Sequence, residues 1–160
     1  MTYCVGMMLD RGLVLMSDTR TNSGVDNIST FRKMHHWSVP GERMIALMTA
    51  GNLATTQSVV SQLAERNKAP SDRHNSLLEA PTMFQVATIV GKLLRDTIRA
   101  QDATNGEDAS GTFSASVIVA GQIKGMEPRL FLIYPEGNFI EATFDTPFFQ
   151  IGETKYGRPI

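Results

Sequence analysis

Three stretches of the chain are apolar at every position, and they constrain the fold more than any other feature. They cover residues 44–48, 117–120 and 130–133. A strand with one face in solvent alternates apolar and polar residues, so strands without that alternation are covered on both faces. The connections between neighbouring strands are short turns, which favours antiparallel pairing. The pattern therefore predicts two antiparallel sheets that face each other, with helices packed outside them.

Turn signals and hydrophobic periodicity divide the rest of the chain into strands and two helices. The first helix is expected over residues 53–68 with Asn52 as its N-cap, and the second is expected to start at Thr82, where Thr82 and Gln85 have the spacing of a capping box. Polar loops are expected at residues 69–81 and 105–111. Strands are expected at residues 2–9, 12–17, 32–39, 43–50, 113–123, 129–134, 139–143 and 148–151.

Length, charge and cysteine content narrow the class of protein. The 160 residues predict one domain, spanning residues 1–160, and 15 basic against 16 acidic residues argue against nucleic acid and anionic membranes as partners. A single cysteine excludes an internal disulfide and a cysteine-rich zinc site. No apolar run reaches the roughly 18 residues of a membrane span. We expect a cytoplasmic protein.

Isolated histidine and cysteine residues give only weak signals for a site. His35 and His36 are neighbours in an expected strand, so their side chains point to opposite faces and cannot share a metal ion. Cys4 lies in the first expected strand and is interpreted as a buried, inert thiol. We predict neither a metal nor an organic cofactor.

A stronger signal combines Thr2, Asp18 and Lys33. Removal of Met1 would make Thr2 the N-terminal residue, the first hairpin would return Asp18 to the start of strand one, and an adjacent strand would present Lys33. A threonine hydroxyl needs a base, and an α-amine with a pKa of about 7.7–8.0 can supply it near neutral pH. A lysine ammonium would lower the pKa of that amine, and a carboxylate would orient the lysine. The alternative interpretation is a surface ion pair of little energetic value.

The same residues lie within a longer set of motifs. Thr2 opens the chain, residues 12–20 read GLVLMSDTR, Lys33 follows, and residues 48–52 read MTAGN at the start of the first helix. This set resembles proteasome β-type subunits. Residues 2–37 and 149–157 resemble, more specifically, the bacterial proteasome-related proteins called Anbu, for ancestral β-subunit. The resemblance implies an α+β fold, the four-layer αββα sandwich of N-terminal-nucleophile hydrolases, and it implies that the family's domain continues past Ile160.

The resemblance also implies roles for individual residues. Thr2 matches the nucleophile, Asp18 the orienting acid, Lys33 the activating lysine and Gly51 the glycine whose N–H stabilises the oxyanion. The family's Gly-Ser-Gly segment reads Gly-Glu-Thr at residues 152–154, which makes Thr154 the nearest hydroxyl to stand in for its serine. The segments matching the two edges of the substrate groove and the specificity pocket contain Arg20, Thr21, Asn22, Gly51 and Leu53.

The resulting functional hypothesis is a threonine-type peptidase. Its partners would be a peptide or unfolded-protein substrate and further copies of the chain, in a ring or an open spiral. Two alternatives remain open: an N-terminal-nucleophile amidase acting on a small amide, and a non-catalytic scaffold subunit of a proteasome-like assembly. The scaffold hypothesis predicts that Met1 is retained, whereas the two enzyme hypotheses require its removal.

Overall fold

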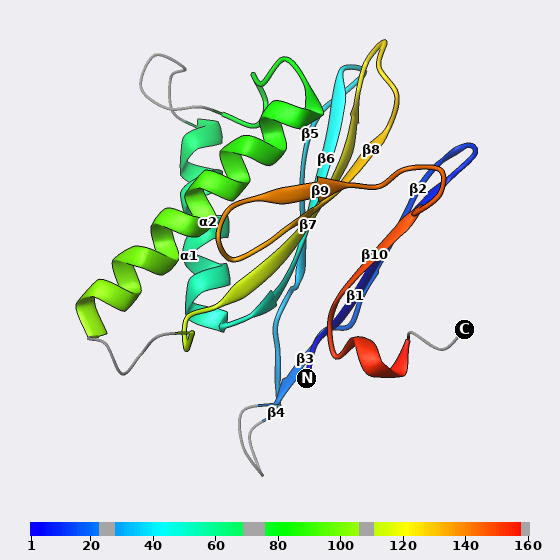
Figure 1. The fold of residues 1–160 in the computed structure, drawn as a ribbon. Helices are drawn as coiled ribbons and strands as arrows, with labels where there is room; N and C mark the ends of the chain where they lie inside the picture. Colours follow the sequence, from blue (N-terminus) through cyan, green and yellow to red (C-terminus); the bar gives the residue numbers. More distant parts are fainter. Residues whose placement is uncertain (23–27, 69–75, 106–110, 158–160) are drawn as a thin grey trace.

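A computed structural model describes residues 1–22, 28–68, 76–105 and 111–157 of the chain. Two long helices follow one another between two runs of strands, in the pattern of an α+β protein (Figure 1). In chain order the elements are β1 (Tyr3–Leu9), β2 (Gly12–Ser17), β3 (Arg20–Asn22), β4 (Ile28–Thr30), β5 (Met34–Val39), β6 (Arg43–Gly51), α1 (Leu53–Lys68), α2 (Met83–Asn105), β7 (Ala115–Ile123), β8 (Arg129–Ile133), β9 (Phe139–Glu141), β10 (Phe148–Gly152) and the 3-10 helix η2 (Thr154–Tyr156).

The described strands form two main sheets. A five-stranded sheet has the order β5-β6-β7-β8-β9 and a three-stranded sheet has the order β10-β1-β2, with antiparallel pairing throughout both. Strands β6 and β7 lie inside the larger sheet and are buried along most of their length. This burial is the physical reason for their continuous apolar sequence.

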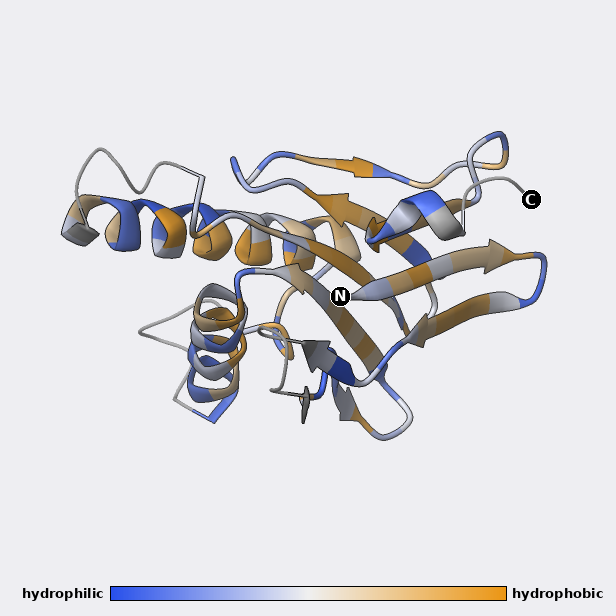
Figure 2. Ribbon diagram, turned by 90° about the horizontal axis from the view of Figure 1, so that it is seen from below, coloured by the Kyte–Doolittle hydropathy of each residue, from blue (hydrophilic) through white to orange (hydrophobic). Residues whose placement is uncertain are grey.

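The two sheets face each other, and α1 and α2 cover the opposite face of the larger sheet (Figure 1). Figure 2 shows hydrophobic residues concentrated along the central strands, whereas the helices carry both hydrophobic and hydrophilic positions. The described residues thus supply three layers: the helix pair, the five-stranded sheet and the three-stranded sheet. The predicted arrangement of facing antiparallel sheets with helices outside is confirmed.

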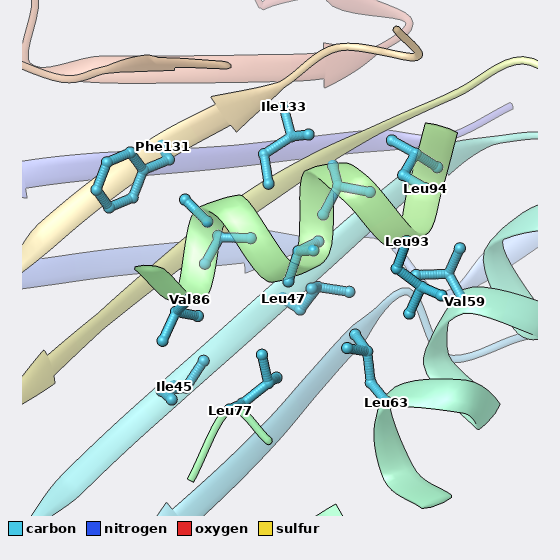
Figure 3. Close-up of a cluster of buried hydrophobic side chains, with 14 of the residues drawn as sticks. Ile45, Leu47, Val59, Leu63, Leu77, Val86, Leu93, Leu94, Phe131 and Ile133 are labelled. Carbon is cyan, nitrogen blue, oxygen red and sulfur yellow. The ribbon is translucent and has the colours of Figure 1, made fainter. Parts of the chain in front are cut away.

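Two clusters of buried side chains hold these layers together. Between the helices and the larger sheet, Val86 and Leu94 of α2 pack with Leu47 of β6 and Phe131 of β8 (Figure 3). The second cluster fills the space between the sheets and includes Cys4, Ile118, Leu130, Phe149 and Ile151. Each fully buried side chain of this kind contributes about 1.5–3 kcal/mol relative to an exposed one.

Both helix N-termini have the predicted caps. The Asn52 side-chain oxygen accepts a hydrogen bond from the Thr55 N–H at 3.0 Å, and the Thr82 hydroxyl accepts one from the Gln85 N–H at 3.2 Å. These bonds satisfy backbone donors that have no partner within the first helical turn. The Asn52 cap also fixes the point at which the chain leaves β6 and enters α1.

The structure differs from the sequence-based expectation mainly in residues 20–34. The strand expected from residue 32 begins at Met34, and a small hairpin, β3 paired with β4, precedes it. Each strand of that hairpin has three residues, which is too short to show an alternating pattern. The strands expected at residues 113–123, 129–134 and 139–143 are shorter than expected by one or two residues, and β10 extends to Gly152. Most of the expected loops at residues 69–81 and 105–111 lies outside the described residues.

Candidate active site

Lys33 lies just before β5, and its ammonium group is the centre of the candidate site. The side chain is only 5% exposed. Its Nζ donates hydrogen bonds to Asp18 Oδ2 at 2.5 Å, to the Arg20 carbonyl at 2.6 Å and to the Met1 carbonyl at 3.0 Å. An ammonium group has three hydrogens, so all three have oxygen acceptors in this structure.

Asp18 is placed by the first hairpin, as the sequence predicted. The register of β1 and β2 pairs Cys4 with Ser17, which brings Asp18 beside Tyr3. The Asp18 Oδ1 atom accepts a hydrogen bond from the Tyr3 N–H at 2.8 Å while Oδ2 binds Lys33. Burial by itself would raise the pKa of Asp18, but the hydrogen bonds from Lys33 and Tyr3 outweigh it and lower that pKa below its ordinary value. Asp18 is therefore ionised at neutral pH.

Thr2 is held by backbone contacts to the segment after β10. The Glu153 N–H donates to the Thr2 carbonyl at 2.6 Å. Gly152 has a φ of +89°, and a Cβ atom there would overlap the Thr2 carbonyl carbon at 2.7 Å. Glycine is thus required where the two backbones meet. Met1 precedes Thr2 and is 72% exposed, whereas its carbonyl oxygen accepts a hydrogen bond from the buried Lys33.

Gly51 ends β6 at the point where α1 begins. Its φ is +114°, and a Cβ atom would come within 2.6 Å of the Ser114 carbonyl oxygen. Thr49, two residues earlier, connects this strand end to the site, because its N–H donates to the Lys33 carbonyl at 3.0 Å. Because α1 begins at Leu53, directly after β6, the positive end of its helix dipole lies at this end of β6.

The residues that the resemblance assigned to substrate binding lie on three elements: β3, the end of β6 and the start of α1. Arg20, Thr21 and Asn22 form β3, and the Arg20 carbonyl contacts Lys33. Leu53 is the first residue of α1 and is half-buried. Asp18, Lys33 and the Met1–Thr2 peptide bond are thus in direct contact, while Gly51 and Leu53 lie further along β6 and into α1.

A cavity of about 390 Å³ opens beside the Met1–Thr2 peptide bond. Thr154 belongs to the adjacent η2 helix and is not among the lining residues, which are Met1, Thr2, Tyr3, Asp18, Glu153 and Gly157. Sequence reasoning did not single out Tyr3, Glu153 or Gly157. The signal for Glu153 was present, because it occupies the middle position of the Gly-Glu-Thr segment.

The neighbouring thiol and histidine do not add a second reactive group. Burial raises the pKa of the Cys4 thiol to about 12, the Asp18 charge adds to this increase, and Lys33 opposes it. Cys4 therefore remains protonated, and its Sγ lies 3.8 Å from the Thr49 carbonyl oxygen. Burial also lowers the pKa of His35, which favours a neutral imidazole.

Two features are absent from the described part of the chain. No group of three or more His, Cys, Asp and Glu side chains within it is arranged to hold a metal ion. Neither of its two long helices is long and apolar enough to cross a membrane.

The described site brings an aspartate, a lysine and the peptide bond before Thr2 together. A charged, oriented lysine lies against the carbonyl of the residue that precedes a threonine, and a glycine at a helix N-terminus ends the neighbouring strand. Together with two facing antiparallel sheets and flanking helices, this arrangement defines the N-terminal-nucleophile hydrolase class of fold.

Comparison with known proteins gives the family. The family model described as "Proteasome subunit" matches residues 2–157, so the chain belongs to the proteasome subunit family. Among solved structures it is similar to Anbu from Yersinia bercovieri, with 50% identity over 98% of this chain and 63% of that one and a TM-score of 0.88. It is also similar to Anbu from Hyphomicrobium sp. strain MC1, with 52% identity over 99% of this chain and 64% of that one and a TM-score of 0.86.

A third similar structure is a helical assembly of the Anbu complex from Pseudomonas aeruginosa, with 47% identity over 98% of this chain and 63% of that one and a TM-score of 0.88. A comparison with curated proteins gives no match. The chain thus spans a little under two thirds of the length of these Anbu structures.

Proposed function

We propose that this protein is a proteasome-like peptidase that hydrolyses peptide bonds with Thr2 as its nucleophile, after removal of Met1. Membership of the proteasome subunit family supports the general activity. The observation that carries the threonine mechanism is the hydrogen bond from Lys33 Nζ to the Met1 carbonyl. It puts the ammonium group next to the peptide nitrogen that becomes the free α-amine of Thr2.

Removal of Met1 turns this contact into a catalytic one. The precursor uses all three hydrogens of Lys33, one of them on the Met1 carbonyl. Loss of that carbonyl releases one donor for the Thr2 hydroxyl oxygen, while Asp18 and the Arg20 carbonyl still hold the ammonium in place. The nearby positive charge also lowers the pKa of the new α-amine, so that more of it is the free base at neutral pH.

The reaction then proceeds in two steps. The Thr2 hydroxyl attacks the substrate carbonyl, its proton passes to the α-amine through a bridging water, and the leaving amine takes that proton as the C–N bond breaks. The acyl group remains on Thr2 Oγ as an ester. A water molecule then attacks the ester and gives a proton to the α-amine. The bond between the acyl carbon and Thr2 Oγ breaks, Thr2 Oγ takes that proton, and the acid is released.

The oxyanion formed in each step needs a hydrogen-bond donor. The Gly51 N–H is proposed for this role because it lies at the start of α1, where the helix dipole favours negative charge. The substrate would lie as an added strand between β3, with Arg20, Thr21 and Asn22, and the Gly51 segment. Leu53 would line the specificity pocket. Thr154 would act by positioning, since it does not line the cavity at the N-terminus.

The proposal includes two kinds of partner, a substrate and further copies of the same chain. The substrate would be a peptide or an unfolded protein, and the site would be enclosed by a homo-oligomeric ring or spiral in the cytoplasm. The Anbu complex of Pseudomonas aeruginosa forms a helical assembly, which supports self-association of this chain.

Replacement of Thr2 tests the proposal directly. We expect Thr2→Ala to reduce peptide hydrolysis by at least about 10³-fold, because both the nucleophile and the ester intermediate are lost. Thr2→Ser keeps a hydroxyl and is the matched control, expected to retain measurable turnover. Fluorogenic peptides measure the rates, and thermal unfolding checks that both variants fold. Undiminished hydrolysis by the alanine variant would disprove the mechanism, and cleavage of small amides alone would disprove the peptide substrate.

A further inference from the structure

The Met1–Thr2 peptide bond, which the proposed function requires to be cleaved, is held by hydrogen bonds on both of its sides. The Met1 carbonyl oxygen accepts one from Lys33 Nζ at 3.0 Å, and the Lys33 side chain is only 5% exposed. The Thr2 carbonyl oxygen accepts one from the Glu153 N–H at 2.6 Å. The carbonyl that has to react is therefore bound inside the site, although Met1 as a whole is 72% exposed.

The residue after Thr2 is fixed as well. The Tyr3 N–H donates to Asp18 Oδ1 at 2.8 Å, and the Tyr3 carbonyl oxygen accepts a hydrogen bond from the Asp18 N–H at 3.0 Å. Tyr3 begins β1, the middle strand of the three-stranded sheet, which is paired with β10 on one side and β2 on the other. The start of the chain can enter the active site of another enzyme only after these bonds open.

The cavity beside the bond does not offer a catalyst another route. Its volume is about 390 Å³, and Met1 and Thr2 contribute to its wall. A space of this size admits water or a small molecule, but not the active site of a second protein. Hydrolysis adds the hydroxyl group of a water to the Met1 carbonyl carbon and a proton to the Thr2 nitrogen, and it is far too slow without a catalyst.

The site itself lacks the base for this cleavage while Met1 is attached. In the proposed mechanism the base is the free α-amine of Thr2. In the precursor that nitrogen is part of a peptide bond, so it cannot accept a proton from the Thr2 hydroxyl. The Lys33 ammonium has all three of its hydrogens bound to oxygen acceptors. The folded precursor therefore depends on an external enzyme that the same fold keeps away from the bond.

The order of synthesis leaves a period in which the N-terminus is free. Roughly 150 residues are added after Thr2 before the chain reaches Glu153, which takes about 8–30 s at about 5–20 residues per second. During this period neither the pairing of β1 with β10 nor the hydrogen bond from Glu153 can form. An enzyme that acts on chain ends can bind the first residues as an extended segment.

Resting on the proposed function, we infer that a methionine aminopeptidase removes Met1 from the nascent or unfolded chain, and that a chain which folds with Met1 attached stays an inactive precursor. In that precursor Lys33 keeps one hydrogen on the Met1 carbonyl and Thr2 has no free α-amine. The reaction that supplies the nucleophile thus precedes folding, and each chain becomes active or inactive once, during its synthesis.

The test follows the loss of one methionine by mass spectrometry and does not depend on peptidase activity. The full chain is produced with Met1 retained, in cells treated with an inhibitor of methionine aminopeptidase, and the folded protein is incubated with the purified aminopeptidase. A synthetic peptide of residues 1–6 is the reference for a free N-terminus. We expect release of Met1 from the folded chain to be at least about 10²-fold slower than from the peptide, because several hydrogen bonds have to open first.

Lys33→Met removes the donor to the Met1 carbonyl and should increase release from the folded chain about tenfold. Lys92→Met is the matched control, since Lys92 is exposed on α2, and it should release Met1 at the wild-type rate. Thermal unfolding checks that both variants fold, and the comparison of the wild-type chain with the peptide needs neither of them.

Three results would overturn this inference and leave the peptidase mechanism intact. They are release from the folded wild-type chain as fast as from the peptide, loss of Met1 with no aminopeptidase added, and release at the wild-type rate from a folded Lys33→Met variant. Peptide hydrolysis by a protein that retains Met1 would instead overturn the proposed function.

Discussion

At the scale of single residues, the site depends on one buried cation with three oxygen acceptors. The sequence allowed the Asp18–Lys33 pair to be predicted, because a two-stranded hairpin with a known turn returns Asp18 to the chain start. The acceptors from Arg20 and Met1 could not be predicted. Both are backbone carbonyls, and their positions depend on β3 and on the register of the sheets rather than on side-chain identity.

The ion pair makes folding stability depend on pH in a defined direction. The folded-state pKa of Asp18 is lowered, so its contribution is complete above the unfolded-state value of about 3.9 and is lost as the pH falls through the lower folded-state value. We expect Asp18→Asn to reduce the free energy of unfolding by about 2 kcal/mol at pH 6, less than for a fully buried pair because Asp18 is partly exposed.

The difference in free energy of unfolding between the wild type and Asp18→Asn should shrink steadily below about pH 4, because Asp18 of the wild type is then protonated. Urea unfolding from pH 3 to pH 7 measures this difference. Asp10→Asn is the control, since Asp10 is exposed in the turn after β1, and it should change stability by less than about 0.5 kcal/mol. If the wild type and Asp18→Asn differ in free energy of unfolding by the same amount at pH 3 and at pH 7, the assigned ion pair is contradicted.

At the scale of elements, long patterned segments were predictable and short or contact-dependent ones were not. The helix α1 matches its expected bounds, and the stripe of α2 lies in the core because its period fits one helix face. The β3–β4 hairpin and η2 were not predicted, since elements of three residues carry no periodicity. The cavity was not predicted either, because it forms where residues 1–3, 18, 153 and 157 meet.

The junction of β6 and α1 gives a test at this scale. Gly51→Ala would put a Cβ atom 2.6 Å from the Ser114 carbonyl oxygen at a φ of +114°. We expect a loss of about 1–3 kcal/mol in stability and of about 10²-fold or more in kcat, as the proposed oxyanion donor is displaced. Thermal unfolding and peptide kinetics measure the two effects.

Gly41→Ala is the control for backbone strain alone. Gly41 also has a positive φ, of +76°, but a Cβ atom there meets nothing within 4 Å. Gly41→Ala should lower the free energy of unfolding by about 1 kcal/mol and leave kcat unchanged. Equal losses of kcat in the two variants would argue against a role for Gly51 in oxyanion binding.

At the scale of the whole molecule, the layered arrangement followed from the sequence and the assembly did not. Continuous apolar strands joined by short turns predicted covered antiparallel sheets, and the structure has them. The outer face of the three-stranded sheet exposes Val14, Met16 and Phe148, a pattern that periodicity alone does not distinguish from a buried face.

The proposed mechanism requires that the working protein begin at Thr2 and form an ester on its hydroxyl. The most direct measurement is mass spectrometry of the protein purified from its own cell, before and after brief reaction with a peptide nitrophenyl ester and an acid quench. We predict a chain that lacks Met1 and carries one acyl group, which peptide mapping places on Thr2 and which Thr2→Ala does not acquire. An active chain that retains Met1, or an acyl group on any other residue, would contradict the account.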